Sequence, residues 1–274
     1  TGLSILKVNP ALFIQPQITL EKTQLYFGAV EGTAVATGTQ GTWVFKYGGG
    51  SLNWRASTDS NWLNAAPPSG TGDSLVDISV NAAGLPAGTY NGTVTIADPN
   101  ASNNPQVIDV VLKVYPTGAA ASPFGYFETP TGGAAVTGSV PVTGWVLHDI
   151  GVESVKIYRN PLPDEGINPV YIGDAIFVEG ARPDVAAAYP DYPLNSRAGW
   201  GYMLLTNFLP NGGNGTFTLR AVVTTVNGQQ FTWETKTITC DNANSVKPFG
   251  AIDTPTQGGK ASGKNFLNWG WALT

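Results

Sequence analysis

Very few side chains in this sequence could carry out covalent or acid–base chemistry. The chain has one histidine, His148, and one cysteine, Cys240. A nucleophilic site of the Ser-His-Asp or Cys-His type would have to use one of them. His148 stands beside Asp149 where a strand should end, which predicts an exposed turn, and Cys240 closes a strand-like run as a small apolar residue. We therefore expect no such nucleophile.

Paired carboxylates are the other common source of catalysis. A glycosidase needs two of them facing each other across a cleft. Asp164, Glu165, Asp184 and Asp191 all fall in predicted loops, and no spacing pairs them. The sequence therefore predicts that the protein is not an enzyme and that it uses no cofactor.

Oxygen ligands for calcium occur near a predicted domain junction. Asp241, Asn242 and Asn244 form a polar turn, and Asp253 follows it. Hard oxygen ligands suit calcium, but the EF-hand spacing is absent, and a solvated linker turn is the simpler interpretation. Four soft or imidazole ligands for zinc cannot be assembled from one histidine and one cysteine. We expect no metal site, and these four residues are the weak calcium candidates.

Aromatic side chains give the best ligand-binding candidates, since the chain has 8 Trp, 10 Tyr and 11 Phe. Trp54 and Trp145 lie in alternating strand-like runs, which predicts that both are in cores. Tyr189, Tyr192 and Trp200 lie in or beside a long insertion and are the best candidates for exposed faces on which a sugar ring would stack. The alternative is that they pack against the protein and hold the insertion in place.

The composition excludes several classes of protein. Only 12% of the residues are charged, the net charge is −5, and no cluster of Lys and Arg occurs, so the electrostatic requirement for nucleic-acid binding is missing. No apolar run approaches the length of a membrane span. The 34 Gly and 20 Pro indicate many short strands joined by tight turns. With one cysteine, no disulfide can form within the chain.

Two motifs occur twice, each time about one small domain apart. Leu-Lys-Val-x-Pro begins at residue 6 and again at residue 112, and Pro-Phe-Gly begins at residue 123 and again at residue 248. The second repeat continues to Gly144-Trp145 and to Gly270-Trp271. The sequence thus reads as part of a tandem array, with two whole modules between pieces of two others.

The first whole module resembles a known family. Short strand-like runs follow one another with turn signals between them, which is typical of a β-sandwich. Its motifs, in order, are Trp54-x-Ala56, Trp62-Leu63, Pro68-x-Gly70 and the run Ala87-Gly-Thr-Tyr-x-Gly-Thr-Val. Together these resemble a BACON-type bacterial Ig-like module over residues 18–115. The resemblance implies an extracellular β-sandwich.

The second whole module is similar to the Ig-like repeats of large bacterial surface proteins. The motifs that carry this resemblance are Gly144–Leu147, Val155–Tyr158 and Gly199–Tyr202. A long insertion breaks the rhythm of the strands, and within it we expect Asp184 to cap a short helix that runs through Tyr189. The predicted final hairpin turns at Asn-Gly 227–228, where a longer loop or a bulge is expected.

The sequence therefore predicts an all-β fold of tandem Ig-like antiparallel β-sandwiches with flanking strands from partial neighbouring modules. The expected segments are the last strand of a preceding module, within residues 3–8, with a linker (1–17), a BACON-like sandwich (18–115), a linker (116–123), an Ig-like sandwich (124–246) with an insertion at 179–199, and the first strands of a following repeat (247–274).

This organisation favours a structural or adhesive role. We expect a stalk, spacer or fibre segment of a secreted or cell-surface bacterial protein, because reach grows with the number of modules in such arrays. The expected partners are neighbouring modules or other copies of the chain, which would polymerise by strand exchange. The alternative is a carbohydrate-binding module whose partner is a polysaccharide.

Overall fold

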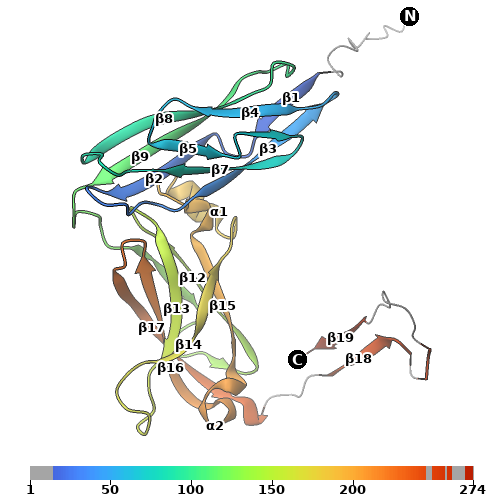
Figure 1. Cartoon of the computed structure of the whole chain (residues 1–274). Helices are drawn as coiled ribbons and strands as arrows, with labels where there is room; N and C mark the ends of the chain where they lie inside the picture. Colours follow the sequence, from blue (N-terminus) through green and yellow to red (C-terminus); the bar gives the residue numbers. More distant parts are fainter. Residues whose placement is uncertain (1–14, 245–248, 257, 261–268, 274) are drawn as a thin grey trace, which may run out of the picture.

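The computed structural model describes residues 15–244, 249–256, 258–260 and 269–273. The strand expected within residues 3–8 lies outside them. Figure 1 shows two β bodies joined at an angle and a separate hairpin beyond the second one. In the part of the chain that is described, no helix is long and apolar enough to cross a membrane.

The first body is a sandwich of two sheets. The four-stranded sheet runs in the order β1 (Pro16–Leu20), β3 (Gln40–Gly48), β7 (Ser74–Val80), β5 (Leu63–Ala66). The five-stranded sheet runs in the order β2 (Gln24–Val30), β9 (Gln106–Tyr115), β8 (Gly88–Ala97), β4 (Asn53–Thr58), β6 (Ser69–Thr71). All neighbours pair antiparallel except β2 and β9, which are parallel.

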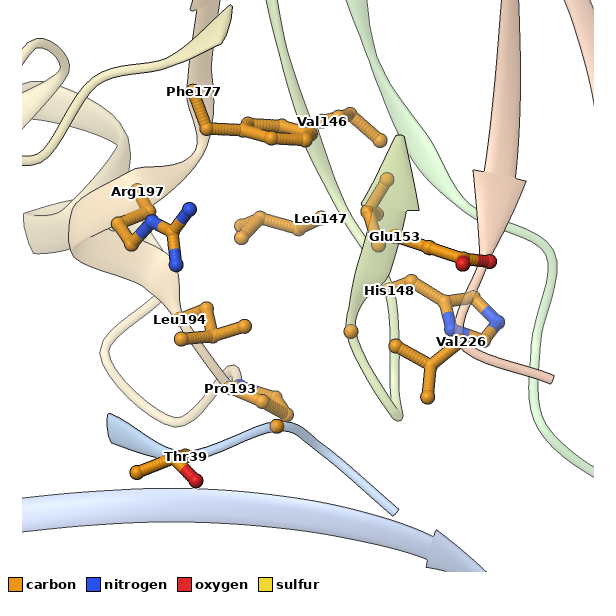
Figure 2. Close-up of a pocket in the computed structure, with 13 residues that line it drawn as sticks. Thr39, Val146, Leu147, His148, Glu153, Phe177, Pro193, Leu194, Arg197 and Val226 are labelled. Carbon is orange, nitrogen blue, oxygen red and sulfur yellow. The ribbon is translucent and has the colours of Figure 1, made fainter. Parts of the chain in front are cut away.

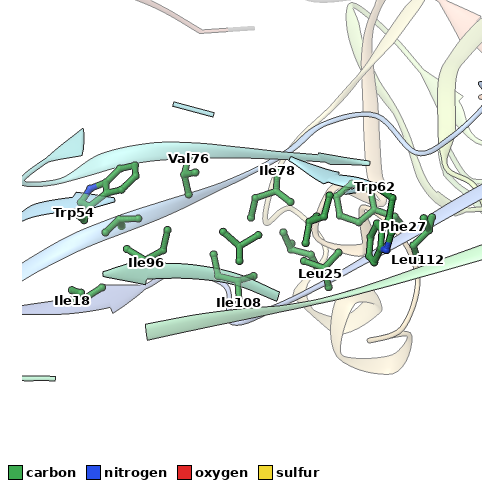
Figure 3. Close-up of a cluster of buried hydrophobic side chains, with 14 of the residues drawn as sticks. Ile18, Leu25, Phe27, Trp54, Trp62, Val76, Ile78, Ile96, Ile108 and Leu112 are labelled. Carbon is green, nitrogen blue, oxygen red and sulfur yellow. The ribbon is translucent and has the colours of Figure 1, made fainter. Parts of the chain in front are cut away.

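The core of this sandwich follows from strict alternation along the strands. In β9 every second residue is buried, namely Ile108, Val110, Leu112 and Val114. Trp54 is fully buried, as its alternating run predicts, and its Nε1 donates to Ser74 Oγ at 2.9 Å. Figure 3 shows Trp54, Ile108 and Leu112 among the side chains that fill the space between the two sheets. Burial of each large apolar side chain stabilises the folded state by about 1.5–3 kcal/mol.

The linker before this sandwich is shorter than the sequence indicates. Pro16 and Gln17 belong to β1 and pair with Gly48 and Tyr47 of β3. β1 is an edge strand, and proline is tolerated as the first residue of such a strand because its missing N–H is not needed there.

The second body is also a sandwich. Backbone hydrogen bonds link its strands in the order β10 (Phe124–Thr129), β12 (Ser139–Leu147), β15 (Gly199–Leu205), β14 (Val170–Phe177), β13 (Val152–Arg159), β16 (Asn214–Thr225), β17 (Gln230–Asp241), β11 (Ala135–Val136). β14 joins the two layers, because it pairs with β13 up to Ala175 and with β15 through Ile176 and Phe177. The main apolar core lies between the layers, and a second buried cluster joins Trp145 and Leu147 of β12 to Val185 and Ala198.

The final hairpin of this sandwich has the longer loop that the sequence indicated, whereas its irregular register lies away from the turn. Four residues, 226–229, separate β16 from β17, and the register shifts between Arg220 and Val222. At the shift, Trp233 and Glu234 together oppose Ala221; Trp233 packs against the core, whereas Glu234 is exposed.

The insertion between β14 and β15 contains two short helices, α1 (Pro183–Ala188) and η2 (Asn195–Arg197). The predicted helix is present, but Asp184 is not its cap: Arg182 holds that position and Pro183 opens the helix. Proline is favoured there because its fixed φ suits the first turn and its missing N–H would have no partner. Three further short helices lie at the far end of this sandwich: η3 (Thr206–Phe208), α2 (Pro210–Gly213) and η4 (Asn242–Asn244).

The last described element is a hairpin of β18 (Phe249–Thr254) and β19 (Trp269–Leu273). It pairs only within itself among the described residues. The predicted all-β fold of tandem Ig-like sandwiches is therefore confirmed, with the refinement that two edge pairs, β2–β9 and β11–β17, are parallel.

Candidate functional site: the joint between the sandwiches

The backbones of the two sandwiches touch directly at Gly28. A Cβ placed on Gly28 would lie 2.0 Å from the carbonyl oxygen of Asp149 and 2.9 Å from Ile150 Cα. Only a glycine in β2 permits this approach. Next to it, the buried Thr37 hydroxyl accepts the Gly28 N–H at 2.8 Å and lies 3.1 Å from the carbonyl oxygen of Ile150.

Charged and phenolic groups surround this backbone contact. Lys22 of the first sandwich forms an ion pair with Glu179 of the second at 2.9 Å. Burial and a hydrogen bond to Asp191 raise the pKa of Tyr26, and burial with the nearby Asp149 carboxylate raises the pKa of Tyr115. Both tyrosines belong to the first sandwich and both aspartates to the second. The joint is thus held by polar contacts on several sides.

Four clefts between the two sandwiches open among the described residues. One, of about 230 Å³, lies between Thr39 of the first sandwich and Leu147, Pro193 and Leu194 of the second (Figure 2). Another, of about 320 Å³ and here called the tyrosine-lined cleft, is lined by tyrosines from both sandwiches together with Lys113 and the two aspartates just named.

His148 is buried at the joint, so the expected exposed turn is wrong at this residue. Its side chain is 1% exposed, and its Nδ1 accepts the N–H of Ile150 at 3.3 Å. Nε2 has no hydrogen-bond partner among the described residues. Burial lowers the pKa of His148, which outweighs the opposing effect of Asp149. The turn comes as predicted at residues 148–151, but its first residue is buried.

Two of the three predicted aromatic residues lie together beside the joint. Tyr189 and Tyr192 are half-buried, and both contact the ring of Phe124 with centroids 5.1 Å apart. Trp145 also joins this cluster, at 5.7 Å from Tyr189. These rings pin the insertion onto β10 and β12, as the packing alternative predicted, and Tyr192 also lines the tyrosine-lined cleft.

Trp200 does not belong to that group, and its expected exposure is wrong. It is 3% exposed and packs in the core against Phe127, with ring centroids 5.7 Å apart. The cause is its position in β15, a central strand, where alternation turns it inward over Gly144.

The loop carboxylates are held apart by separate arginine partners. Arg159 binds Glu165 with both guanidinium nitrogens, at 2.5 and 2.6 Å, and this lowers the pKa of Glu165 to about 2. Arg182 similarly lowers the pKa of Asp184 to about 2. Neither carboxylate faces a second carboxylate across a cleft in the described structure, so these groups form salt bridges.

The weak calcium candidates have other roles in the described structure. Both carboxylate oxygens of Asp241 accept hydrogen bonds from the Asn244 side-chain amide. The Asn242 Oδ1 accepts hydrogen bonds from the Gly138 N–H and the Thr206 hydroxyl. Asp253 lies in β18. In the described part of the chain, no three His, Cys, Asp or Glu side chains gather as a metal site would require. The expectation of no metal site, with these four residues as weak calcium candidates, stays a prediction.

No family model matches the chain. No curated protein matches it either. Among solved structures, a GH5 xyloglucanase of Bacteroides ovatus in complex with a XXXG heptasaccharide is similar at 18% identity and a TM-score of 0.30, over 45% of this chain. This chain spans only 27% of that protein.

Two tandem-domain structures are similar over more of the chain. A chimeric titin Z1Z2 shares 12% identity at a TM-score of 0.32, over 84% of this chain and 98% of that one. The fibronectin(III)-like modules of Clostridium thermocellum CbhA share 11% identity at a TM-score of 0.30, over 85% and 97%. The architecture itself rests on the sheet topology described above.

The residues that build the joint are not marked as a group in the sequence. One signal is present: Gly28 interrupts the apolar run of β2, and glycine inside a strand often marks a close backbone approach. Thr37 and Tyr26 carry no such mark, because their role depends on which surface the second sandwich presents to them.

Proposed function

We propose that this chain is a stiff structural segment of a secreted or cell-surface bacterial protein built from tandem β-sandwiches, in which it acts as a spacer or stalk. The observation that carries the proposal is the direct contact of Gly28 with the Asp149–Ile150 backbone. Domains joined by a linker alone usually move relative to each other. Here the contact, the Thr37 hydroxyl and the Lys22–Glu179 pair fix the angle between the sandwiches.

The location and the wider assembly belong to the same proposal. The BACON-type motifs of the first sandwich and the surface-repeat motifs of the second support a secreted or cell-surface bacterial protein. The repeated hairpin β18–β19 supports an array that continues from module to module, or polymerises by strand exchange, and so supports an adhesive or filament role.

Pulsed EPR distance measurement tests the stiffness of the joint. Labels are placed at Ser57→Cys and Thr235→Cys, which are exposed positions on the two sandwiches. The native Cys240 is buried and burial raises its pKa, so it reacts slowly and does not interfere. We expect a single narrow distance distribution. A broad distribution, as from a flexible linker, would contradict the proposal.

A second candidate function, polysaccharide binding, is favoured by the tyrosine-lined cleft at the joint. Half-buried tyrosines from both sandwiches, Tyr26, Tyr115 and Tyr192, line it together with Asp149 and Asp191. Aromatic faces beside carboxylates are suited to a neutral sugar, which needs both stacking and hydrogen-bond acceptors.

The test of this second candidate is retention on a panel of immobilised polysaccharides. Binding in the cleft is supported if the native chain is retained on one polysaccharide and Tyr192→Ala is not. The control is Tyr171→Ala, at an exposed tyrosine of β14, which should be retained like the native chain. Elution of the native chain from every polysaccharide at the void volume would leave the structural role alone.

A further inference from the structure

The hairpin β18–β19 repeats the first hairpin of the second sandwich in its register as well as its sequence. Phe249 pairs with Leu273 as Phe124 pairs with Leu147. The register of both hairpins then shifts at the same place, between Phe127 and Thr129 in the first and between Ile252 and Thr254 in the second. β18 and β19 are thus the counterparts of β10 and β12.

The two hairpins also share one close backbone approach. A Cβ on Gly144 would lie 2.1 Å from the Tyr126 carbonyl oxygen, and a Cβ on its counterpart Gly270 would lie 2.2 Å from the Ala251 carbonyl oxygen. At Gly144 the next nearest atoms belong to the ring of Trp200, at 2.5 and 2.9 Å. At Gly270 the three nearest atoms all belong to β18.

Their surroundings differ. Phe127 and Trp145 of the first hairpin are 2% and 5% exposed, whereas the counterparts Ile252 and Trp271 are 78% and 49% exposed. β12 has a second neighbour, β15, on its other edge, and β19 has β18 as its only strand neighbour among the described residues. An apolar strand with an open edge is a template for pairing with another strand.

The second sandwich itself shows which strand suits this edge. β15 pairs with β12 so that Gly199 lies across from Trp145, Trp200 from Gly144 and Gly201 from Thr143. Carried over to β19, a Gly-Trp-Gly strand would place its tryptophan over Gly270. Its two glycines would then lie across from the bulky Trp271 and Trp269.

We propose that the edge of β19 that faces away from β18 pairs antiparallel with a β15-type strand, with a tryptophan across from Gly270, as part of a further sandwich of the same kind as the second one. This inference deepens the proposed function, on which it rests, by naming the partner of the terminal hairpin. The strand covers the open edge of β19, and the facing sheet of that sandwich covers Ile252, which stands where Phe127 stands in the second sandwich.

The test supplies the missing complement to the full chain. The chain is extended after residue 274 with a second copy of residues 148–244, which contains β13 to β17. Hydrogen exchange is then followed by mass spectrometry. We expect amide exchange in the 270–273 segment to slow at least about 100-fold relative to the unextended chain.

Matched variants of the extension test the register. With alanine in place of the copied Trp200, amide exchange in the 270–273 segment should be at least about tenfold faster than in the extended chain, because the ring over Gly270 is lost. Alanine in place of the copied Met203, which is 55% exposed in the original, should leave it unchanged.

Three outcomes overturn the inference. One is exchange at 270–273 as fast as in the unextended chain. Another is equal protection with and without the copied Trp200. The last is an unextended chain that is already a dimer with β19 protected, which would assign the edge to a second copy. The EPR distance between the two sandwiches, measured on the same proteins, reports separately on the proposed function.

Discussion

The Thr37 hydroxyl of the first sandwich lies 3.1 Å from the carbonyl oxygen of Ile150 in the second, and Thr37 is 4% exposed. The same hydroxyl accepts the Gly28 N–H at 2.8 Å and lies 3.2 Å from the Gly28 carbonyl oxygen. Its single proton is therefore shared between two carbonyl groups that belong to different sandwiches. One side chain thus satisfies backbone groups on both sides of the joint.

Thr37→Val should loosen this joint. Valine keeps the shape of threonine but leaves the Gly28 N–H and the Ile150 carbonyl without this partner, at a cost of about 1–3 kcal/mol. We expect a lower urea midpoint and a broader EPR distance distribution between the sandwiches. Thr71→Val, at an exposed position in β6, is the matched control and should change neither. An unchanged distance distribution in Thr37→Val would show that the hydroxyl does not hold the joint.

Gly28→Ala should separate the sandwiches without unfolding them. The added Cβ would overlap the Asp149 carbonyl oxygen at 2.0 Å, and backbone must move to relieve the overlap, at a cost of about 1–3 kcal/mol. Small-angle scattering should show a larger radius of gyration, and circular dichroism should keep its β-sheet signal. Gly38→Ala is the control, because a Cβ there meets no atom within 4 Å. The same radius of gyration in both variants would contradict the prediction.

The cores are predictable because alternation is a local signal. In β9 and around Trp54, apolar residues at every second position determine both the strand and its buried face. The repeated Pro-Phe-Gly motif likewise predicts a second copy of one hairpin, and β18–β19 has that pairing. A pattern that repeats every two residues needs no knowledge of the rest of the fold.

The joint is not predictable in the same way, because it depends on how two finished surfaces meet. His148 follows a strand and sits in a turn, which usually means exposure, yet it is buried where it lines a cleft of the joint. Trp200 was expected to be exposed because the insertion beside it suggests a loop. It is buried because it lies at the start of a central strand. Asp184 loses the capping position to Arg182 because Pro183 fixes where the helix begins.

Stability should fall on mild acidification because of His148. Burial puts its folded pKa below the ordinary value of 6.5, so the unfolded chain binds the proton more readily. The contribution is fully present above pH 6.5 and is lost as the pH falls below it. Protonation at Nδ1 would also remove the acceptor for the Ile150 N–H. Ile150 is the residue whose carbonyl oxygen accepts the Thr37 hydroxyl across the joint.

Urea unfolding at a series of pH values measures this effect, and the imidazole NMR signal is unambiguous because the chain has one histidine. His148→Asn keeps an acceptor near Nδ1 but does not titrate, and should remove the dependence between pH 7 and pH 5. A folded His148 that titrates at or above 6.5 would refute the assignment.

Glu165→Gln should destabilise the second sandwich at neutral pH. Arg159 is 6% exposed, and Glu165 binds it through two charged hydrogen bonds, so the glutamine variant leaves a nearly buried guanidinium without its counter-ion. The folded pKa of Glu165 is about 2, against an ordinary 4.5. The stabilisation is therefore present above pH 4.5 and is lost as the pH falls toward 2.

Melting temperatures measure this effect. Those of the native chain and the Glu165→Gln variant should differ at pH 7 and converge near pH 2. The control is Asp164→Asn, at an exposed neighbour, which should follow the native chain throughout. A constant difference across this range would mean that the effect of the variant is steric and not electrostatic.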